Sequence, residues 1–403
     1  MSNTQKKNVP ELRFPGFEGE WEEKKLGDLT TKIGSGKTPK GGSENYTNKG
    51  IPFLRSQNIR NGKLNLNDLV YISKDIDDEM KNSRTYYGDV LLNITGASIG
   101  RTAINSIVEI HANLNQHVCI IRLKKEYYYN FFGQYLLSRK GKRKIFLAQS
   151  GGSREGLNFK EIANLKIFTP TIFEEQQKIG EFISKLDRQI ELEEQKLELL
   201  QQQKKGYMQK IFSQELRFKD ENGNDYPDWT NERLGEVTTV TMGQSPKSVN
   251  YTDNSNDTVL IQGNADIENG LINPRIYTRE VTKLIQKDEI ILTVRAPVGK
   301  LAMAQINACI GRGVCSIKGD KFLYYFLEWF ATQNKWIRFS QGSTFESISG
   351  NDIRNIHIKI PVEDERTKII KLLNSLDVLN SKTDLKIQNL KQRKQSLLQK
   401  IFV

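Results

Sequence analysis

The chain has 403 residues, of which 37% are hydrophobic, and it carries a formal net charge of +12. This length is typical of two or three domains, and a basic excess of this size favours a polyanionic partner. Its three cysteines, Cys119, Cys309 and Cys315, include no CxxC pair, and neither an export leader nor a run of 18 apolar residues occurs. These features argue against a disulfide framework, a zinc ribbon and a membrane span, so we expect a reduced, cytoplasmic protein.

Residues 1–172 are predicted to form a globular domain of mixed α/β structure. Short apolar and β-branched runs predict strands at 51–54, 90–95 and 118–123. The aromatic stretch 127–137 is apolar on most faces, which is typical of a buried helix. Asn61-Gly62 predicts a hairpin turn.

A long helix is predicted next, at 173–212. Its apolar residues recur in alternating steps of four and three, which is the 3.5-residue period of a supercoiled helix. The seam formed in this way comprises Ile179, Ile183, Leu186, Ile190, Leu197 and Leu200. A largely charged helix with one narrow apolar stripe needs a partner.

The rest of the chain repeats this organisation, with a second domain at 213–361 and a second helix at 362–403. Leu12-Arg13-Phe14 returns as Leu216-Arg217-Phe218, and Asn61-Gly62 returns as Asn269-Gly270. Strands are predicted at 259–261 and 289–294 and a helix at 321–333. The second seam comprises Ile369, Leu373, Leu376, Ile387, Leu390 and Leu397. The duplication predicts that the two long helices pair with each other; the alternative is that each packs on its own domain.

The basic charge lies mainly outside the long helices. Residues 173–212 hold 7 basic and 8 acidic side chains, and residues 362–402 hold 9 and 5, which leaves +9 for the remainder. The two domains agree at glycine, proline and apolar positions but differ at polar ones, as where Arg55-Ser56-Gln57 matches Gln262-Gly263-Asn264. One frame that recognises two different targets would show this pattern.

No complete catalytic motif is present. Residues 34–38 resemble the end of a phosphate-binding loop, but Thr31 stands where its first glycine should be, and Pro39 follows where a helix should begin. His111 and His117 lie near Cys119, yet the second copy has no matching histidine, which argues against a metal site. We expect no enzymatic activity, no metal and no cofactor bound by this chain.

Polar and basic loop residues are the remaining candidates for function. Arginine suits guanine, asparagine and glutamine suit adenine, and lysine mainly contacts phosphate. In the first domain the candidate DNA-binding residues are Thr38, Arg55, Gln57, Asn58, Arg60, Arg84, Arg101, Arg139, Lys140, Lys142 and Arg143. In the second they are Gln244, Ser245, Lys247, Gln262, Asn264, Arg275, Arg295, Lys300 and Arg312. The basic run 139–144 is the best candidate for phosphate contact.

The order of these elements resembles the specificity subunits of type I restriction–modification systems. The most specific marks are the duplication itself, Leu26-Gly27 with Gly36-x-Thr38-Pro39, and Pro170 followed by Glu175-Gln176-x-x-Ile179. The second copy departs from the last mark with Glu365-Arg366-x-x-Ile369.

The resemblance implies two tandem α/β target recognition domains separated by two long conserved helices that form an antiparallel coiled coil. Each domain would read one half of a bipartite target in double-stranded DNA, and the helices would set the spacing and dock two methyltransferase subunits. Those partners would bind S-adenosylmethionine to methylate adenine N6, and two restriction subunits that use ATP and magnesium are a further option. Two other interpretations remain open: a general tandem nucleic-acid-binding adaptor outside restriction–modification, and a structural coiled-coil scaffold.

Overall fold

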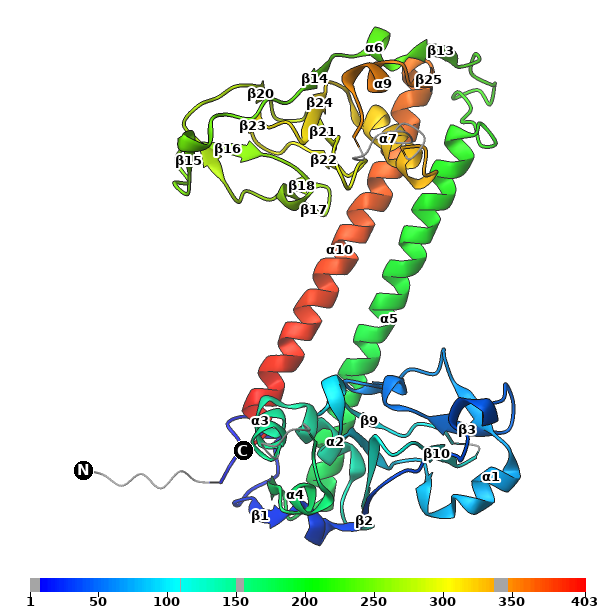
Figure 1. The fold of residues 1–403 in the computed structure, drawn as a ribbon, viewed down its shortest axis with the longest axis vertical. Coiled ribbons are helices and arrows are strands. Elements are labelled where there is room, and N and C mark those ends of the chain that lie inside the picture. The colour runs from blue at the N-terminus through cyan, green and yellow to red at the C-terminus, as the bar shows by residue number, and fades with distance from the viewer. Residues whose placement is uncertain (1–7, 109, 150–155, 337–346) are drawn as a thin grey trace, which may run out of the picture. The chain divides into compact units, whose positions relative to one another are not determined.

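The computed structural model describes residues 8–108, 110–149, 156–336 and 347–403. They form two compact units, Met1–Gln195 with Asp384–Val403, and Lys196–Thr383. The boundary between the units falls inside both long helices, α5 (Phe173–Phe212) and α10 (Glu363–Ile401) (Figure 1). Each unit therefore contains one globular domain and one half of each long helix.

The first domain is built around a central antiparallel sheet that is covered on both faces. In sheet order its strands are β2 (Thr30–Ser35), β11 (Val118–Leu123), β8 (Val90–Asn93) and β9 (Thr102–Ile104). Val90 and Leu92 pack into the core beneath the helices, while Leu91 packs into a separate core against a second sheet. A strand buried on both faces is apolar throughout, which explains why residues 90–92 show no alternation.

The second sheet and the helices complete this domain. In sheet order the strands are β6 (Val70–Ile72), β3 (Ile51–Leu54), β10 (Ala112–Leu114) and β7 (Arg84–Thr85), with β3 parallel to β10. Two small pairings add β1 (Glu22–Lys25) with β12 (Lys166–Thr169), and β4 (Ile59–Arg60) with β5 (Lys63–Leu64) across Asn61-Gly62. The helices are α1 (Lys74–Glu79), α2 (Tyr129–Leu137), α3 (Arg139–Leu147) and α4 (Phe159–Ala163).

The second domain repeats the same topology. Its central sheet has the order β14 (Val240–Met242), β24 (Val314–Ile317), β21 (Ile290–Thr293), β22 (Leu301–Met303), β18 (Leu271–Ile272) and β17 (Ile267–Glu268). The other sheet has the order β15 (Tyr251–Thr252), β19 (Tyr277–Thr278), β16 (Thr258–Ile261), β23 (Ala308–Ile310) and β20 (Leu284–Ile285), and β16 is parallel to β23. The remaining elements are β13 (Thr230–Arg233), β25 (His357–Ile360), α6 (Leu234–Val237), α7 (Lys321–Thr332) and α9 (Gly350–Arg354). The mixed α/β fold and its duplication are confirmed.

A buried glutamate attaches the start of each long helix to its domain. Glu175 accepts two hydrogen bonds of 2.8 Å from Arg13, and a third of 3.3 Å from the indole of Trp21. In the second unit, Glu365 accepts bonds of 2.8 and 2.9 Å from Arg217. These contacts explain why the Leu-Arg-Phe and tryptophan positions recur in the sequence.

Within each unit the two long helices run antiparallel and are linked by ion pairs. In the first unit Asp187 meets Lys394 at 2.5 Å. Further along α5, Glu193 pairs with Lys386, so the numbering rises on one helix as it falls on the other. In the second unit Lys204 lies 2.7 Å from Asp377. The predicted antiparallel pairing is therefore present in both units.

The predicted seam is buried most deeply where it joins the domain cores. Eight seam residues are buried, namely Ile179, Ile183, Leu186, Ile190, Ile369, Leu373, Leu376 and Ile387. The other four are half-buried, namely Leu197, Leu200, Leu390 and Leu397. Ile401 and Phe402, at the end of α10, belong to the core of the first domain. The alternative in which each helix packs only on its own domain is therefore wrong.

One detail of the long helices differs from the sequence prediction. At the end of α10 the buried leucine is Leu398, while the predicted Leu397 is only half-buried. Near the start of α5, Gly180 lies where α2 crosses the helix, because an added Cβ would come within 2.9 Å of the Tyr128 ring. None of the helices in the described ranges has the length and apolar character that a membrane crossing requires.

Candidate nucleic-acid interface

Four loops of the first domain meet at one edge of its sheets. They are residues 36–39, 55–57, 94–101 and 115–117, which follow β2, β3, β8 and β10, and we call them the first loop edge. Backbone hydrogen bonds join them: Gly36 to Val118 (3.2 Å), Lys37 to Leu114 (2.9 Å), Asn115 to Leu54 (3.1 Å) and Ile94 to His117 (3.0 Å), each from N–H to carbonyl. The loops therefore form one ordered surface.

The second domain has an equivalent surface, the second loop edge, made of residues 243–247, 262–264, 294–300 and 311–313. The same four bonds recur: Gly243 to Val314 (3.0 Å), Gln244 to Ile310 (2.9 Å), Gly311 to Ile261 (2.8 Å) and Val294 to Gly313 (2.9 Å). The backbone frame is thus shared, while the side chains that it carries differ.

A glycine fixes the crossing of loops at each edge. A Cβ added to Gly36 would lie 2.0 Å from the carbonyl oxygen of Leu114, and one added to Gly243 would lie 2.1 Å from that of Gly311. No side chain fits at these distances, so the hydroxyl-Pro turns that follow, at Thr38 and Ser245, are held against the loops 115–117 and 311–313.

Several of the predicted residues of the first domain lie on the first loop edge. Gln57 is exposed, and the half-exposed Arg101 has no side-chain partner within the described ranges. Arg55 already makes two contacts within its domain: its guanidinium lies over the ring of Tyr46 and donates to the carbonyl of Asp68 at 2.9 Å. Arg60 is exposed on the β4–β5 hairpin, which follows the loop 55–57.

Two predicted residues of the first domain have side-chain partners inside the fold. Asn58 is buried, where its side chain accepts the N–H of Arg55 at 2.8 Å and donates to the carbonyl of Asn65 at 2.9 Å. Arg84 forms ion pairs with Asp77 at 2.5 Å and Asp78 at 2.8 Å. Both side chains therefore have structural roles within the first domain, and their contact with DNA stays a prediction.

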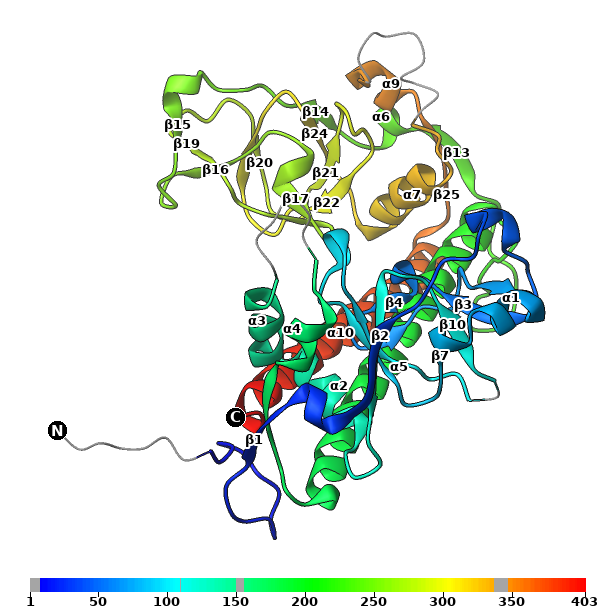
Figure 2. The ribbon, with the colours of Figure 1, turned by 60° about the horizontal axis from the view of Figure 1, so that its bottom comes forward.

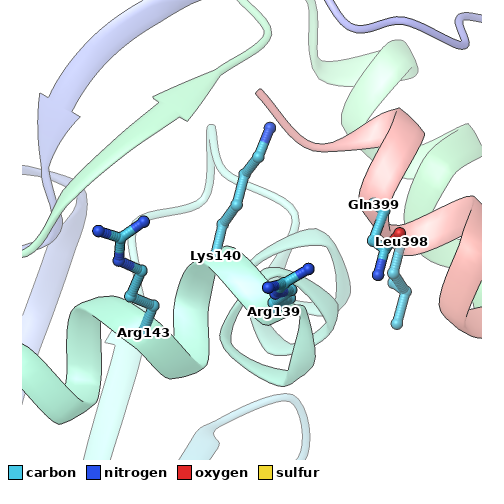
Figure 3. A pocket seen from close by; sticks show the side chains of 5 residues that line it. All are labelled: Arg139, Lys140, Arg143, Leu398 and Gln399. Carbon is cyan, nitrogen blue, oxygen red and sulfur yellow. The ribbon is translucent and has the colours of Figure 1, made fainter.

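The predicted basic run lies on α3 and beside α10. Arg139, Lys142 and Arg143 are exposed, and Lys140 donates to the carbonyl of Phe402 at 2.6 Å. Helix α3 lies close to the C-terminal end of α10 (Figure 2). A pocket of about 590 Å³ is lined by Arg139, Lys140 and Arg143 of α3 and by Leu398 and Gln399 of α10 (Figure 3). Lys144 is different, since burial lowers its pKa and its ammonium donates to the carbonyl of Lys166.

Most predicted residues of the second domain lie on the second loop edge. They are Gln244, Ser245, Lys247, Gln262, Asn264, Arg295 and Arg312, of which Gln244, Lys247, Arg295 and Arg312 are exposed. Arg275 is exposed on a neighbouring loop, 4.0 Å from Asp266. Lys300 has internal partners, because its ammonium donates to the carbonyls of Asn264 (3.1 Å) and Ile267 (2.6 Å).

Sequence reasoning missed two residues on the first loop edge. Gln116 is exposed and its amide oxygen accepts a hydrogen bond from the hydroxyl of Thr38. His117 lies 2.6 Å from the hydroxyl of Thr95 through Nδ1. Their alignment with Arg312-Gly313 in the repeat was the signal that could have identified them, because Arg312 was itself predicted.

Two of the three histidines, His111 and His117, have side-chain partners, and the three cysteines are free and buried. His111 lies 3.0 Å from the carboxylate of Asp77. Burial raises the pKa of the Cys119 and Cys315 thiols to about 12, so both are protonated at neutral pH. Within the described part of the chain, no three or more His, Cys, Asp and Glu side chains gather as metal ligands would.

Two copies of one α/β frame, each with its own polar loop edge, define a protein with two recognition domains. The family model for the type I restriction modification DNA specificity domain matches residues 18–202 and again 226–392. The chain therefore belongs to this family, as a non-catalytic specificity subunit with two target recognition domains.

Relatives and solved structures agree with this assignment. The chain is 28% identical over 377 residues to the MjaX type I restriction enzyme specificity subunit of Methanocaldococcus jannaschii, covering 89% of this chain and 87% of that protein. Its fold matches the crystal structure of a type I S subunit from M. genitalium, with a TM-score of 0.64, 16% identity and coverage of 98% and 99%. A chain from a solved type I restriction–modification system gives a TM-score of 0.58 at 20% identity and covers 94% and 97%.

Proposed function

We propose that each loop edge reads one half of a bipartite target in double-stranded DNA. The observation that carries this proposal is the shared frame: the same four backbone hydrogen bonds hold different polar side chains in the two domains. A frame that stays constant while its exposed polar groups change is suited to two different base sequences. The charge fits the same partner, because the net +12 lies mainly outside the long helices.

The basic helix α3 is proposed to contact phosphate rather than bases. Its exposed cations are Arg139, Lys142 and Arg143, and two of them, Arg139 and Arg143, line the pocket that Figure 3 shows. Contacts of this kind fix the position of a protein on DNA and carry no sequence information. Their removal should weaken binding equally for all sequences and reduce its dependence on salt concentration.

The two long helices are proposed to set the spacing between the half-sites and to dock two methyltransferase subunits. Their ion-paired, antiparallel halves in both units support a rigid connection. The methyltransferase subunits would bind S-adenosylmethionine and methylate adenine, and restriction subunits would bring ATP and magnesium. The complex would act in the cytoplasm, and this chain would bind no cofactor itself.

The test is the adenine methylation pattern of a host that lacks restriction–modification systems of its own. The host would carry this chain with the methyltransferase subunit encoded beside it, or either one alone. We expect a split motif that is methylated only when both proteins are present. No new methylation from two proteins that are expressed and assembled would favour a general nucleic-acid adaptor instead.

A further inference from the structure

We propose that Gln116 and Arg312 are the same base-reading position in the two domains, where Gln116 selects an adenine and Arg312 a guanine. This inference rests on the proposed function and assigns a residue and a base to each half-site. Both side chains are exposed on their loop edges.

The equivalence of the two positions follows from the backbone. Gln116 lies between β10 and β11, and Arg312 lies between β23 and β24. The residue before each donates its N–H to the end of a parallel strand, at Leu54 or Ile261. The residue after each accepts from the loop that follows the central strand, at Ile94 or Val294. Each position is therefore fixed from both sides in the same way.

A hydroxyl group adds a further restraint at each position. The hydroxyl of Thr38 donates to the amide oxygen of Gln116, and Ser245 Oγ accepts the backbone N–H of Arg312 at 3.1 Å. Both hydroxyls belong to the turns that the close-approach glycines Gly36 and Gly243 hold in place. A residue ordered before binding loses less conformational entropy when it meets its ligand.

The free hydrogen-bonding groups of the two side chains differ. With Thr38 on one lone pair of its oxygen, Gln116 still presents its amide N–H groups and the second lone pair, which is the donor and acceptor pair that matches adenine N7 and N6. Arg312 has no side-chain partner among the described residues, so its fork of donors is available for guanine O6 and N7. Lys300, another predicted residue of the second domain, already donates to two backbone carbonyls.

The variants Gln116→Arg and Arg312→Gln test the inference. Each has a control with the same change in net charge at the opposite end of the following strand. Glu126→Gln, beyond the end of β11, matches Gln116→Arg, and Lys318→Gln, beyond the end of β24, matches Arg312→Gln; both control side chains are exposed. The full chain is used in complex with its methyltransferase subunit throughout.

The methylated motif is read first, and the affinity of the purified complex is then measured for duplexes changed at one base pair at a time. Arg312→Gln should reduce the preference for guanine at one position of one half-site by roughly 5- to 150-fold, the range for a bidentate base contact. Gln116→Arg should change one position of the other half-site from adenine to guanine. The controls should leave both halves unchanged.

The outcomes separate this inference from the proposed function. If the wild-type complex methylates no split motif, the proposed function fails. If it does, but the variants keep the same motif or weaken binding equally at every position, only the assignment of Gln116 and Arg312 is overturned. A variant that yields no methylation is judged by the same duplex competition, where equal loss at all positions also counts against the inference.

Discussion

At the scale of single residues, a nearby carboxylate can give a predicted DNA-binding arginine a structural role instead, as Asp77 does for Arg84. Asp77 is buried and accepts hydrogen bonds from Arg84, His111 and Asn113. Burial by itself would raise the pKa of Asp77, but the bonds from Arg84, Asn113 and His111 outweigh it, and the pKa lies below its ordinary value of 3.8. Asp77 is therefore ionised at neutral pH and needs its cationic partner.

Arg84→Ala should therefore destabilise the first unit and leave the recognised sequence unchanged. Without the guanidinium, the buried carboxylate of Asp77 keeps only His111 and Asn113 as partners among the described residues, and a buried charge that loses its cationic partner destabilises the fold. Arg60→Ala, at an exposed position without a partner in the described ranges, should change stability by less than about 0.5 kcal/mol. Hydrogen exchange of peptides from the first unit, measured in rising urea, checks both variants. Equal effects of the two substitutions would contradict this assignment.

Residue type was predictable from the sequence, but the partner of each residue was not. Asn58, Arg84 and Lys300 have the chemistry of DNA contacts, yet each is satisfied inside its own domain. The partners of Asn58 and Arg84 lie within seven residues and are brought into reach by local turns, whereas those of Lys300 lie 33 and 36 residues away and depend on the tertiary fold. Gln116 shows the converse, since only the fold brings its loop beside Thr38.

At the scale of elements, periodicity predicted the long helices well, because a seam that recurs every 3.5 residues is a local property of the sequence. Helix α5 spans Phe173–Phe212, as the pattern indicated. The pattern did not show that the helix ends complete the domain cores. It also gave no account of Gln176 and Arg366, which differ between the copies. Gln176 accepts the N–H of Tyr128 at 3.0 Å, which attaches α5 to the start of α2. Arg366 pairs with Asp320 at 2.7 Å, which attaches α10 to the start of α7.

A polar layer crosses the helices in each unit, and the two layers differ by one charge. In the first unit Gln134 donates to Asp187, which also pairs with Lys394. In the second unit Lys204 pairs with both Asp377 and Glu328, and Glu328 comes from α7 as Gln134 comes from α2. The second layer thus carries an additional carboxylate, that of Glu328, which is half-buried.

The pH dependence of the second unit should reveal this carboxylate. Burial raises the pKa of Glu328 above its ordinary 4.5, although Lys204 partly offsets the effect. A carboxyl group with a raised pKa contributes stability below its unfolded value, and that contribution is lost as the pH rises through the folded pKa. Glu328→Gln should therefore reduce the decline of the second unit's free energy of unfolding as the pH rises above 4.5. The variant should then be more stable than the wild type at pH 7.

The matched variant is Gln134→Glu, which should introduce the same decline with rising pH into the first unit. Urea unfolding at a series of pH values, followed by hydrogen exchange for each unit separately, measures both. A second unit that gains no stability at neutral pH from Glu328→Gln would show that the ion pair with Lys204 outweighs the cost of burial.

At the scale of the whole molecule, the duplication makes the two domains exchangeable at defined strand boundaries. Strands β1 and β12 enclose the first domain as β13 and β25 enclose the second. A chain in which residues 230–360 replace residues 22–169 should therefore keep its frame. Gln176→Arg is included, so that Asp320 of the transplanted α7 meets the arginine with which it pairs in its own unit.

This chimera should direct methylation to a target with two copies of the half-sequence that the second domain reads. The wild-type chain and a chimera without Gln176→Arg serve as controls, and the latter should assemble less well but read the same bases. A motif that keeps the first half-sequence, or that changes in both halves, would contradict independent reading by the two domains.

The long helices offer the last prediction, because an insertion that preserves the seam isolates length from packing. Seven residues added after Gln195 in α5 and seven after Thr383 in α10, where the unit boundary crosses both helices, keep the 3.5-residue seam in phase. Each helix becomes about 10 Å longer at ~1.5 Å per residue, which corresponds to roughly three base pairs of DNA at ~3.4 Å each. The half-sequences should stay the same while the spacer between them grows. Seven residues inserted after Asn222, in an exposed turn of the second unit, should leave the spacer as it is. An unchanged spacer in the paired helix insertion would show that the helices do not set the distance between the half-sites.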